Sequence, residues 1–407
     1  WCKILDSLLE PFLDYTSRTM GQDLQSPGPL RPRCRQPAGQ CMVKTHSILC
    51  LLQGKFEERL MEYCSCEHLC SVLVRHGLFP TSLLAPRLAI SVHLLDFYQA
   101  SFERSCDAIN AFAATCKTRS ITPAVQWYDN LLVLVDKTMD AALKMADNKV
   151  QRAKVRENAP TNDNSGAIDP DSNQTVKPEE ECDWVLQHRC PACFSGNIFG
   201  LSLDDRGGDI HVSIDGNFNH RHIRREGNTQ QYFQPEYYLP KDYVDEVGDH
   251  LDLLRKKTPK SVKPKVPDAA VDECEDGHIA ASGKKVKTST KIYDDTGTMA
   301  LVCRHDIPIF LANIDTPGEQ QKYAVALIKK LYSMAPKTAT VLVFYDIGCV
   351  LDRTFARVSI AYPSDITSRL AFVTSAMHAY AHQWACQLYY NPRLRNSTGL
   401  SDGEGTD

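Results

Sequence analysis

Two features are scarce in this 407-residue sequence: long apolar runs and an excess of positive charge. No apolar run reaches the roughly 18 residues that a helix needs to cross a bilayer, so we expect no membrane segment. The formal net charge is −4, so any surface that binds nucleic acid must be local. A secretory signal peptide is missing too, but the chain begins at Trp1 rather than Met. We therefore expect a fragment or a mispredicted gene product, for which a missing leader means little.

Cysteine, in contrast, is abundant, with 16 residues in the chain. Hydrophobic residues make up 43% of the sequence, which is enough for cores in roughly two or three domains. Several cysteines stand at Cys-x-Cys and Cys-x-x-Cys spacings. Such clusters, without a signal peptide, favour reduced thiolates that bind zinc over disulfides.

The first cysteine cluster is CSCEHLC at residues 64–70. Four possible ligands in so short a stretch are too close for one tetrahedral site without strain. We therefore expect zinc on two or three of Cys64, Cys66, His68 and Cys70, completed by a more distant ligand. The candidates for that ligand are Cys34, Cys41 and His46. The alternative is a set of free buried thiols at a helix start.

Composition divides the chain into two domains. Residues 1–157 predict a Cys-rich, mostly helical domain, with helices across 71–116 and an amphipathic helix over 123–150. Residues 158–181 lack aromatic side chains and are rich in Pro, Asn, Asp, Ser and Glu, which is typical of a disordered linker. We place the second domain at 182–407.

A second cysteine cluster begins the second domain with Cys190-Pro-Ala-Cys193. A single Cys-x-x-Cys is a weak signal that leaves redox and structural roles open. Cys303-Arg304-His305 is the best complement, because it follows an expected strand in the same domain. Our hypothesis is one structural zinc on Cys190, Cys193, Cys303 and His305. The alternates are Cys182, His188 and Cys274. A thiol-redox role is less favoured, because the FSGN that follows is not helix-forming.

Two expected strands of the second domain end in an acid. In DIHVSIDGNF, residues 209–218, apolar and polar residues alternate up to Asp215, and a Gly-Asn turn signal follows. The apolar run ATVLVFYDI, residues 339–347, ends on Asp346. A carboxylate at a buried strand end must be solvated, paired or bound to a metal, or it merely begins a turn. Glu404 supplies a third acid, and three carboxylates on separate elements suit two divalent cations.

A basic and polar segment separates the two acidic strands. Arg221, Arg224 and Arg225 follow the first acid and are candidates for phosphate contact. Residues 226–290 are polar and rich in lysine, and we expect a disordered, solvated insert. A strand pair at 298–304 and 307–314 and a helix over 318–334 come next.

The order strand, insert, two strands, helix, strand is that of an RNase H-like core, which makes this an α/β domain. In such a core the Asp346 strand would lie parallel to the Asp215 strand, with both acids at one edge.

One further pattern lies near the end. Residues 375–390 predict a helix on which His378, His382 and Cys386 recur at steps of four and share a face. That spacing can bind zinc. With apolar and aromatic residues around them, we favour satisfied polar groups in a core.

Taken together, these motifs are similar to one family, the fungal KDZ (Kyakuja–Dileera–Zisupton) transposases with an N-terminal CxC cysteine-cluster domain. The N-terminal resemblance covers residues 64–116, from CSC through HGLFPTSLLAPRLAISVHLLDFYQASFERSCDAINA. The catalytic resemblance covers residues 190–404. It consists of CPACF, DGNF, YDDTG, CRH, DTPGEQQKYA, YDIGC, HAYAHQWACQ and DGEG, in that order.

The resemblance implies a DDE-type DNA transposase with an RNase H-like fold. Matched motif by motif, Asp215, Asp346 and Glu404 would hold two Mg²⁺ or Mn²⁺ ions, and the cysteine clusters would hold structural Zn²⁺. The resemblance also implies transposon DNA ends as partner, a homo-oligomer and a nuclear location.

The chain departs from the family pattern near its end. Members continue past DGEG into a helical Glu-Arg segment, whereas this chain reads GEGTD and stops. We therefore expect a C-terminally truncated, domesticated or decayed copy, in which Glu404 lies on a frayed tail and the truncation threatens activity. The alternative function is a zinc-stabilised module that binds DNA or protein and has no catalysis.

Overall fold

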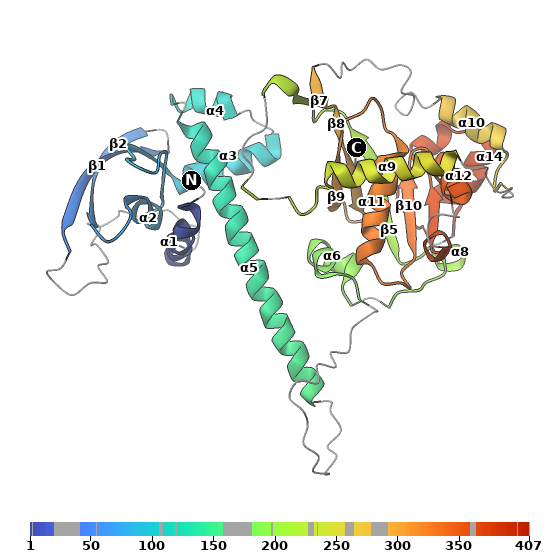
Figure 1. Cartoon of the computed structure of the whole chain (residues 1–407), viewed down its shortest axis with the longest axis horizontal. Helices are drawn as coiled ribbons and strands as arrows, with labels where there is room; N and C mark the ends of the chain where they lie inside the picture. The colour runs from blue at the N-terminus through green and yellow to red at the C-terminus, as the bar shows by residue number, and fades with distance from the viewer. Residues whose placement is uncertain are drawn as a thin grey trace, which may run out of the picture. The chain divides into compact units, whose positions relative to one another are not determined.

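The computed structural model describes two compact units, Trp1–Ala167 and Ile168–Asp407, which we treat separately (Figure 1). The described residues are 1, 3–19, 41–53, 55–105, 109–118, 120–157, 181–196, 198–226, 232–233, 235–256, 264–277, 292–358, 364–396 and 398–406. Nearly all of the predicted linker, 158–181, lies outside them. Within these residues, no helix combines the length and the apolar character that crossing a bilayer requires.

The first unit contains a four-stranded sheet that the sequence analysis missed, in the order β2-β1-β4-β3. The β1–β2 hairpin is antiparallel, and β4 joins β1 in parallel. The strands are β1 (Val43–Leu52), β2 (Lys55–Cys64), β3 (Leu78–Pro80) and β4 (Leu88–Ser91). The helices described in this unit are α1 (Leu5–Thr19), α2 (Leu69–Arg75), α3 (Val92–Ser105), α4 (Ile109–Thr115) and α5 (Ile121–Glu157).

The expectation of helices throughout residues 71–116 is therefore wrong in part. Leu88 and Ile90 belong to β4, and the helix begins only at Val92. Ile90 is fully buried between neighbouring strands, so tertiary pairing decides its conformation over the helical period of the residues that follow.

The second unit is built on a five-stranded sheet in the order β11-β10-β5-β8-β9. Strands β10, β5 and β11 run parallel, and β8 and β9 are antiparallel to their neighbours. The strands are β5 (Ile210–Asn217), β8 (Gly297–Cys303), β9 (Pro308–Ile314), β10 (Val341–Tyr345) and β11 (Leu370–Val373). The predicted strand pair and the predicted parallel pairing of the two acid-bearing strands are both confirmed.

The two faces of this sheet are covered differently. Ile210, Val212 and Ile214 of β5 face the main core together with α11 (Gln321–Met334) and α12 (Gly348–Val358). On the opposite face, Leu342 and Phe344 of β10 form a smaller apolar cluster with Ala371 and Val373 of β11. Short helices α6 (Trp184–Arg189), α7 (Pro191–Phe194) and α8 (Leu203–Arg206) precede the sheet.

The described part of the insert is folded, which corrects the expectation of a disordered segment. It contains α9 (Lys241–Arg255) and α10 (Asp268–Gly277), which bury Val244, Val247, Leu251, Val271 and Cys274.

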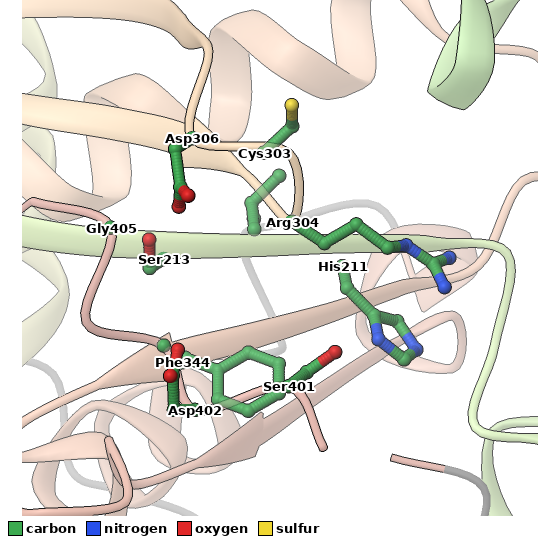
Figure 2. Close-up of a pocket in the computed structure, with 11 residues that line it drawn as sticks. His211, Ser213, Cys303, Arg304, Asp306, Phe344, Ser401, Asp402 and Gly405 are labelled. Carbon is green, nitrogen blue, oxygen red and sulfur yellow. The ribbon is translucent and has the colours of Figure 1, made fainter. Parts of the chain in front are cut away.

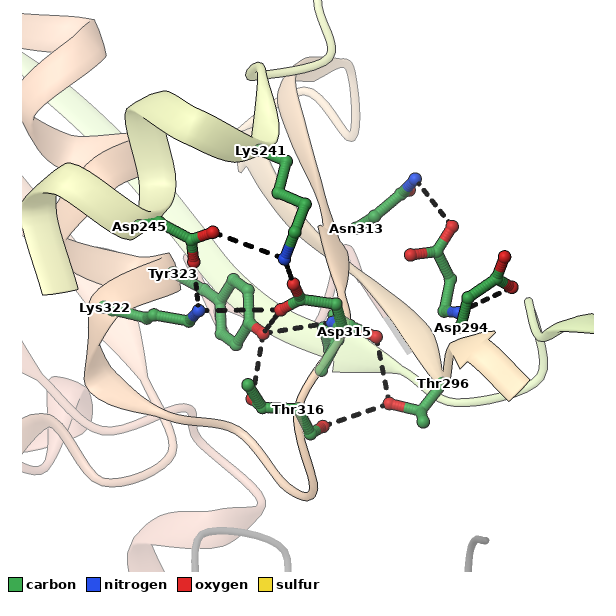
Figure 3. A network of polar contacts seen from close by, with 11 residues as sticks. Lys241, Asp245, Asp294, Thr296, Asn313, Asp315, Thr316, Lys322 and Tyr323 are labelled. Atoms are coloured by element: carbon green, nitrogen blue, oxygen red, sulfur yellow. Dashed lines mark hydrogen bonds and ion pairs between the residues drawn. The ribbon is translucent and has the colours of Figure 1, made fainter. Parts of the chain in front are cut away.

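Polar contacts tie α9 to the junction of β9 and α11 (Figure 3). Lys322 Nζ lies 2.7 Å from Asp245 Oδ1 and 3.5 Å from Asp315 Oδ1, and Lys241 also pairs with Asp315. The Tyr323 hydroxyl donates to Asp315 Oδ1 at 2.6 Å. Apolar burial and these ion pairs together hold the insert helix against the sheet unit.

Candidate functional site

Asp215 and Asp346 come from neighbouring parallel strands at the same level. Tyr345, the last residue of β10, pairs with Ile214, and each acid is the next residue in the chain. Asp346 thus lies just after β10, whereas β5 continues through Gly216 and Asn217, which corrects the turn expected there. Because side chains alternate along a strand, both acids project to the face opposite the main core. The Gly216 N–H donates to Asp215 Oδ1 at 2.7 Å. The predicted parallel pairing, which places these two positions side by side, is confirmed.

Asp346 is buried, at 7% exposure of the residue, and its carboxylate has two side-chain partners. The Ser375 hydroxyl donates to Asp346 Oδ1, and His378 Nδ1 lies 2.9 Å from the same oxygen. Both partners follow β11. The carboxylate is therefore oriented by residues outside its own strand.

Glu319 is a third acid at this edge, and the sequence analysis missed it. It precedes α11, is 4% exposed, and packs so tightly on the strand end that a Cβ at Gly216 would lie 2.5 Å from Glu319 Oε1. Burial, followed by the charges of Asp215 and Asp346, raises the pKa of Glu319 to about 8. Its Oε2 atom is buried without a hydrogen-bond partner among the described residues.

Glu404 also reaches this region, so the expectation of a frayed tail is wrong. The Met377 N–H donates to Glu404 Oε1 at 2.7 Å, and the Ala376 N–H donates to the Asp402 carbonyl at 2.8 Å. His378 Nδ1 lies 3.9 Å from Glu404 Oε2, so one imidazole faces the carboxylates of both Glu404 and Asp346.

The tail that carries Glu404 packs on the sheet (Figure 2). Gly403 has φ +81°, and a Cβ there would lie 2.5 Å from Phe344 Cβ of β10. Gly405 contacts Asp306 so closely that a Cβ would collide with its carboxylate. Because neither glycine has a Cβ, the backbone at Gly403 and Gly405 can lie close to Phe344 and Asp306. This close approach fixes the position of Glu404, which lies between the two glycines.

His378, His382 and Cys386 do not share one helical face, which corrects another expectation. The helix predicted over 375–390 is divided into η2 (His378–Ala381) and α14 (Trp384–Tyr390). His382 and Gln383 between them have extended backbones. As a result, His378 faces the acids, whereas His382 and Cys386 turn toward other cysteines.

The four ligands predicted for one zinc come together. Cys190, Cys193, Cys303 and His305, which we call the hairpin cluster, have ligand atoms that all lie within 4.8 Å of one another. His305 Nδ1 is 3.2 Å from Cys193 Sγ and 3.5 Å from Cys190 Sγ. A hydrogen bond from Cys193 lowers the pKa of the Cys303 thiol to about 5 against the effect of burial. A thiolate among thiols and an imidazole could hold zinc.

The three alternates lie elsewhere. Cys182 is buried outside the hairpin cluster, and His188 stacks on Trp184 with ring centroids 5.8 Å apart. Cys274 joins Cys349, His382 and Cys386 in a group that satisfies the same 4.8 Å distance and that we call the insert cluster.

The N-terminal cysteines are placed partly as predicted. Cys41, Cys64 and Cys66 form a group with Sγ distances of 2.7 Å from Cys64 to Cys41 and 2.9 Å from Cys64 to Cys66. Cys70 does not join this group, which corrects the prediction for it. Its thiol instead donates to the Leu83 carbonyl at 3.3 Å, and burial raises its pKa to about 11. Cys34, one of the suggested ligands, lies outside the described residues.

The predicted basic residues Arg221, Arg224 and Arg225 are exposed just beyond the end of β5. Arg221 Nε donates to the Phe218 carbonyl at 2.8 Å, and Arg225 Nε pairs with Glu226 Oε1 at 3.2 Å. Because these arginines are exposed and follow Asp215 closely in the chain, their side chains are accessible to the phosphates of a nucleic acid.

Comparison with known proteins adds one match. Residues 209–407 match the family model described as Kyakuja-Dileera-Zisupton (KDZ) transposase. The resemblance inferred from the motifs is confirmed for that part of the chain. The CxC resemblance lies outside the matched residues and stays a prediction. No curated protein and no solved structure matches the chain.

Proposed function

Residues 209–407 belong to the KDZ transposase family, and from this premise we propose that they form an RNase H-like, DDE-type domain that cleaves and transfers DNA strands. The proposal depends on one observation: β5 and β10 are adjacent and parallel, and their register places Asp215 and Asp346 side by side. The sheet order supports the RNase H-like assignment. The first strand, β5, lies between an antiparallel hairpin on one side and two parallel strands on the other.

The acids at this edge are candidate ligands for divalent cations. Mg²⁺ and Mn²⁺ prefer carboxylate oxygens, and this edge supplies Asp215, Asp346 and Glu404, with Glu319 buried beside the first two. Burial, followed by the charges of Asp215 and Asp346, raises the pKa of Glu319, and its Oε2 is buried without a hydrogen-bond partner among the described residues. A cation bound beside these acids would relieve both conditions. Two such ions, when bound, would activate the attacking water or hydroxyl and stabilise the leaving oxygen.

The protein's own groups would prepare this site. Ser375 and His378 fix the orientation of the Asp346 carboxylate, and the Gly216 N–H fixes that of Asp215. His378 also faces Glu404, so it would couple the position of the tail to that of the strand. Carboxylates held by such partners need little reorganisation on binding metal and substrate.

A transposase family implies DNA as the partner. We propose that Arg221, Arg224 and Arg225 contact the DNA backbone, because they are exposed and follow the strand of Asp215. A nuclear location and action as a homo-oligomer are further parts of this proposal, and their support comes from the family alone.

A second candidate is a zinc-stabilised module that binds DNA or protein without catalysis. The observation that favours it is the number of contacts already made by Asp346, whose Oδ1 faces both Ser375 and His378. Such a carboxylate could serve structure alone.

Nicking of supercoiled plasmid in Mn²⁺ separates the two candidates. We expect nicking by the full chain and a loss of at least about 100-fold in Asp215→Asn and Asp346→Asn, since each change removes a metal ligand worth several kcal/mol. Glu404→Gln should show a similar loss. Asp249→Asn, an exposed acid of α9, is the matched control. Nicking that survives both Asp→Asn changes, or is absent from the unaltered chain, would favour the binding module.

A further inference from the structure

The insert cluster gathers four possible metal ligands from four separate elements. Cys274 lies on α10, Cys349 on α12, His382 just after η2, and Cys386 on α14. Their ligand atoms all lie within 4.8 Å of one another, and the three cysteines are buried. These helices lie together at one end of the second unit (Figure 1).

The composition and spacing suit tetrahedral zinc. A Zn–S distance of about 2.3 Å places tetrahedral ligand atoms about 3.7 Å apart, which is within the spread of this group. Three thiols and one imidazole are a ligand set that structural zinc sites use. A disulfide would involve only two of the three cysteines. It would not account for the third thiol and the imidazole, whose ligand atoms lie within the same 4.8 Å.

His382 is oriented as a metal ligand. Its Nδ1 faces the thiols, at 3.6 Å from Cys349 Sγ, while its Nε2 lies 2.6 Å from the carbonyl oxygen of Asp346. A metal on Nδ1 requires the proton to be on Nε2, where it donates to that carbonyl. The Gln383 N–H, which donates to Cys274 Sγ at 3.3 Å, favours a thiolate there.

We propose that Cys274, Cys349, His382 and Cys386 bind a structural zinc ion, and that this ion positions the backbone of Asp346. The first part depends only on the ligand geometry. The second part rests on the proposed function, in which Asp346 is a catalytic carboxylate.

Two connections link the ion to Asp346. Cys349 follows Asp346 by three residues at the start of α12, and His382 holds the Asp346 carbonyl directly. The ion would also fasten the insert to the sheet unit, because Cys274 is supplied by α10. Without it, α10 would keep ion pairs to α12, such as the 2.8 Å contact between Arg353 and Glu275.

Zinc content tests the site without reference to activity. Full-length protein purified from zinc-supplemented cells should lose one zinc per chain in Cys386→Ala and in Cys274→Ala, measured by elemental analysis. Cys182→Ala, a buried cysteine outside both clusters, should retain the full content. The change in Cys274 keeps the test usable if the Cys386 variant does not fold, because Cys274 is on the insert. Unchanged zinc content in both ligand variants would overturn the proposal.

Replacement of the histidine separates binding from positioning. In His382→Cys a thiolate replaces Nδ1, so zinc should be retained, but the hydrogen bond to the Asp346 carbonyl is lost. We expect full zinc content with Mn²⁺-dependent nicking reduced about tenfold, the scale of changes around metal ligands. Retained zinc with unchanged nicking would overturn the positioning part alone. If the unaltered chain does not nick DNA, the proposed function fails, while the zinc measurement still decides the site.

Discussion

The two cysteine–histidine clusters of the second unit share a ligand set of three thiols and one imidazole, but the chain assembles them differently. In the hairpin cluster, the ligands come as two close pairs, Cys190 with Cys193 and Cys303 with His305. In the insert cluster, the ligands come from four elements, and the closest two are four residues apart. The first kind of site can be found by spacing, whereas the second exists only after the unit has folded.

The clusters also differ in their distance from the acids. Cys303 pairs with Val212 of β5, three residues before Asp215, which is about 10 Å along a strand. The insert cluster instead contacts Asp346 through His382. We therefore expect the hairpin cluster to support stability alone and the insert cluster to support stability together with the acidic site.

The largest expected effect is that of removing metal from both clusters. Structural zinc contributes on the order of 10 kcal/mol, which is comparable to the whole stability of a typical domain. Full-length protein dialysed against a zinc chelator should lose its cooperative thermal transition in near-ultraviolet circular dichroism. Added Zn²⁺ should restore it, and added Mg²⁺ serves as the control. Metal-free protein that melts within about 3 °C of the loaded protein would contradict a structural role for either cluster.

A site residue could be predicted from the sequence only where neighbouring residues in the chain carry a clear pattern. Asp215 and Asp346 could be predicted because each directly follows the apolar residues of a strand with a clear pattern, although β5 itself continues through Asn217. Glu319 could not be predicted this way, because its only local signal is an acid before a helix, which also suits the helix dipole. Its role depends on Gly216, which is distant in sequence and approaches it only in the folded sheet.

The same reasoning explains the errors about secondary structure. The apolar pattern of residues 375–390 is helical, but His382 and Gln383 are extended, since His382 bonds to a strand-end carbonyl far away in sequence. The helix α10 lies in a polar segment, and only Val271 and Cys274 are buried in it. Tertiary contacts outweigh local propensity in both places, and a single sequence does not reveal such contacts.

A smaller effect is expected when the hairpin cluster alone is broken. Cys193→Ser should remove one zinc per chain and lower the melting temperature by about 10 °C, because a four-ligand site loses a buried ligand. Nicking, assayed well below the new transition, should stay within twofold of the unaltered protein. Cys182→Ser controls for the loss of a buried thiol. A folded Cys193→Ser protein with tenfold weaker nicking would remove the distinction between the two clusters.

The smallest effect concerns the polar contacts near the insert cluster. The Tyr390 hydroxyl donates to Asp352 Oδ2 at 2.8 Å, and Lys265 Nζ lies 2.9 Å from the same carboxylate, which joins α14, α12 and the segment before α10. Tyr390→Phe removes one hydrogen bond and leaves the lysine in place. It should cost about 1–2 kcal/mol, or roughly 2–8 °C in melting temperature, with zinc content and nicking unchanged. Tyr332→Phe, which removes a buried hydroxyl bonded to the Arg369 carbonyl, is the matched control. If Tyr390→Phe also released a zinc ion and Tyr332→Phe did not, the carboxylate network rather than the metal would organise these helices.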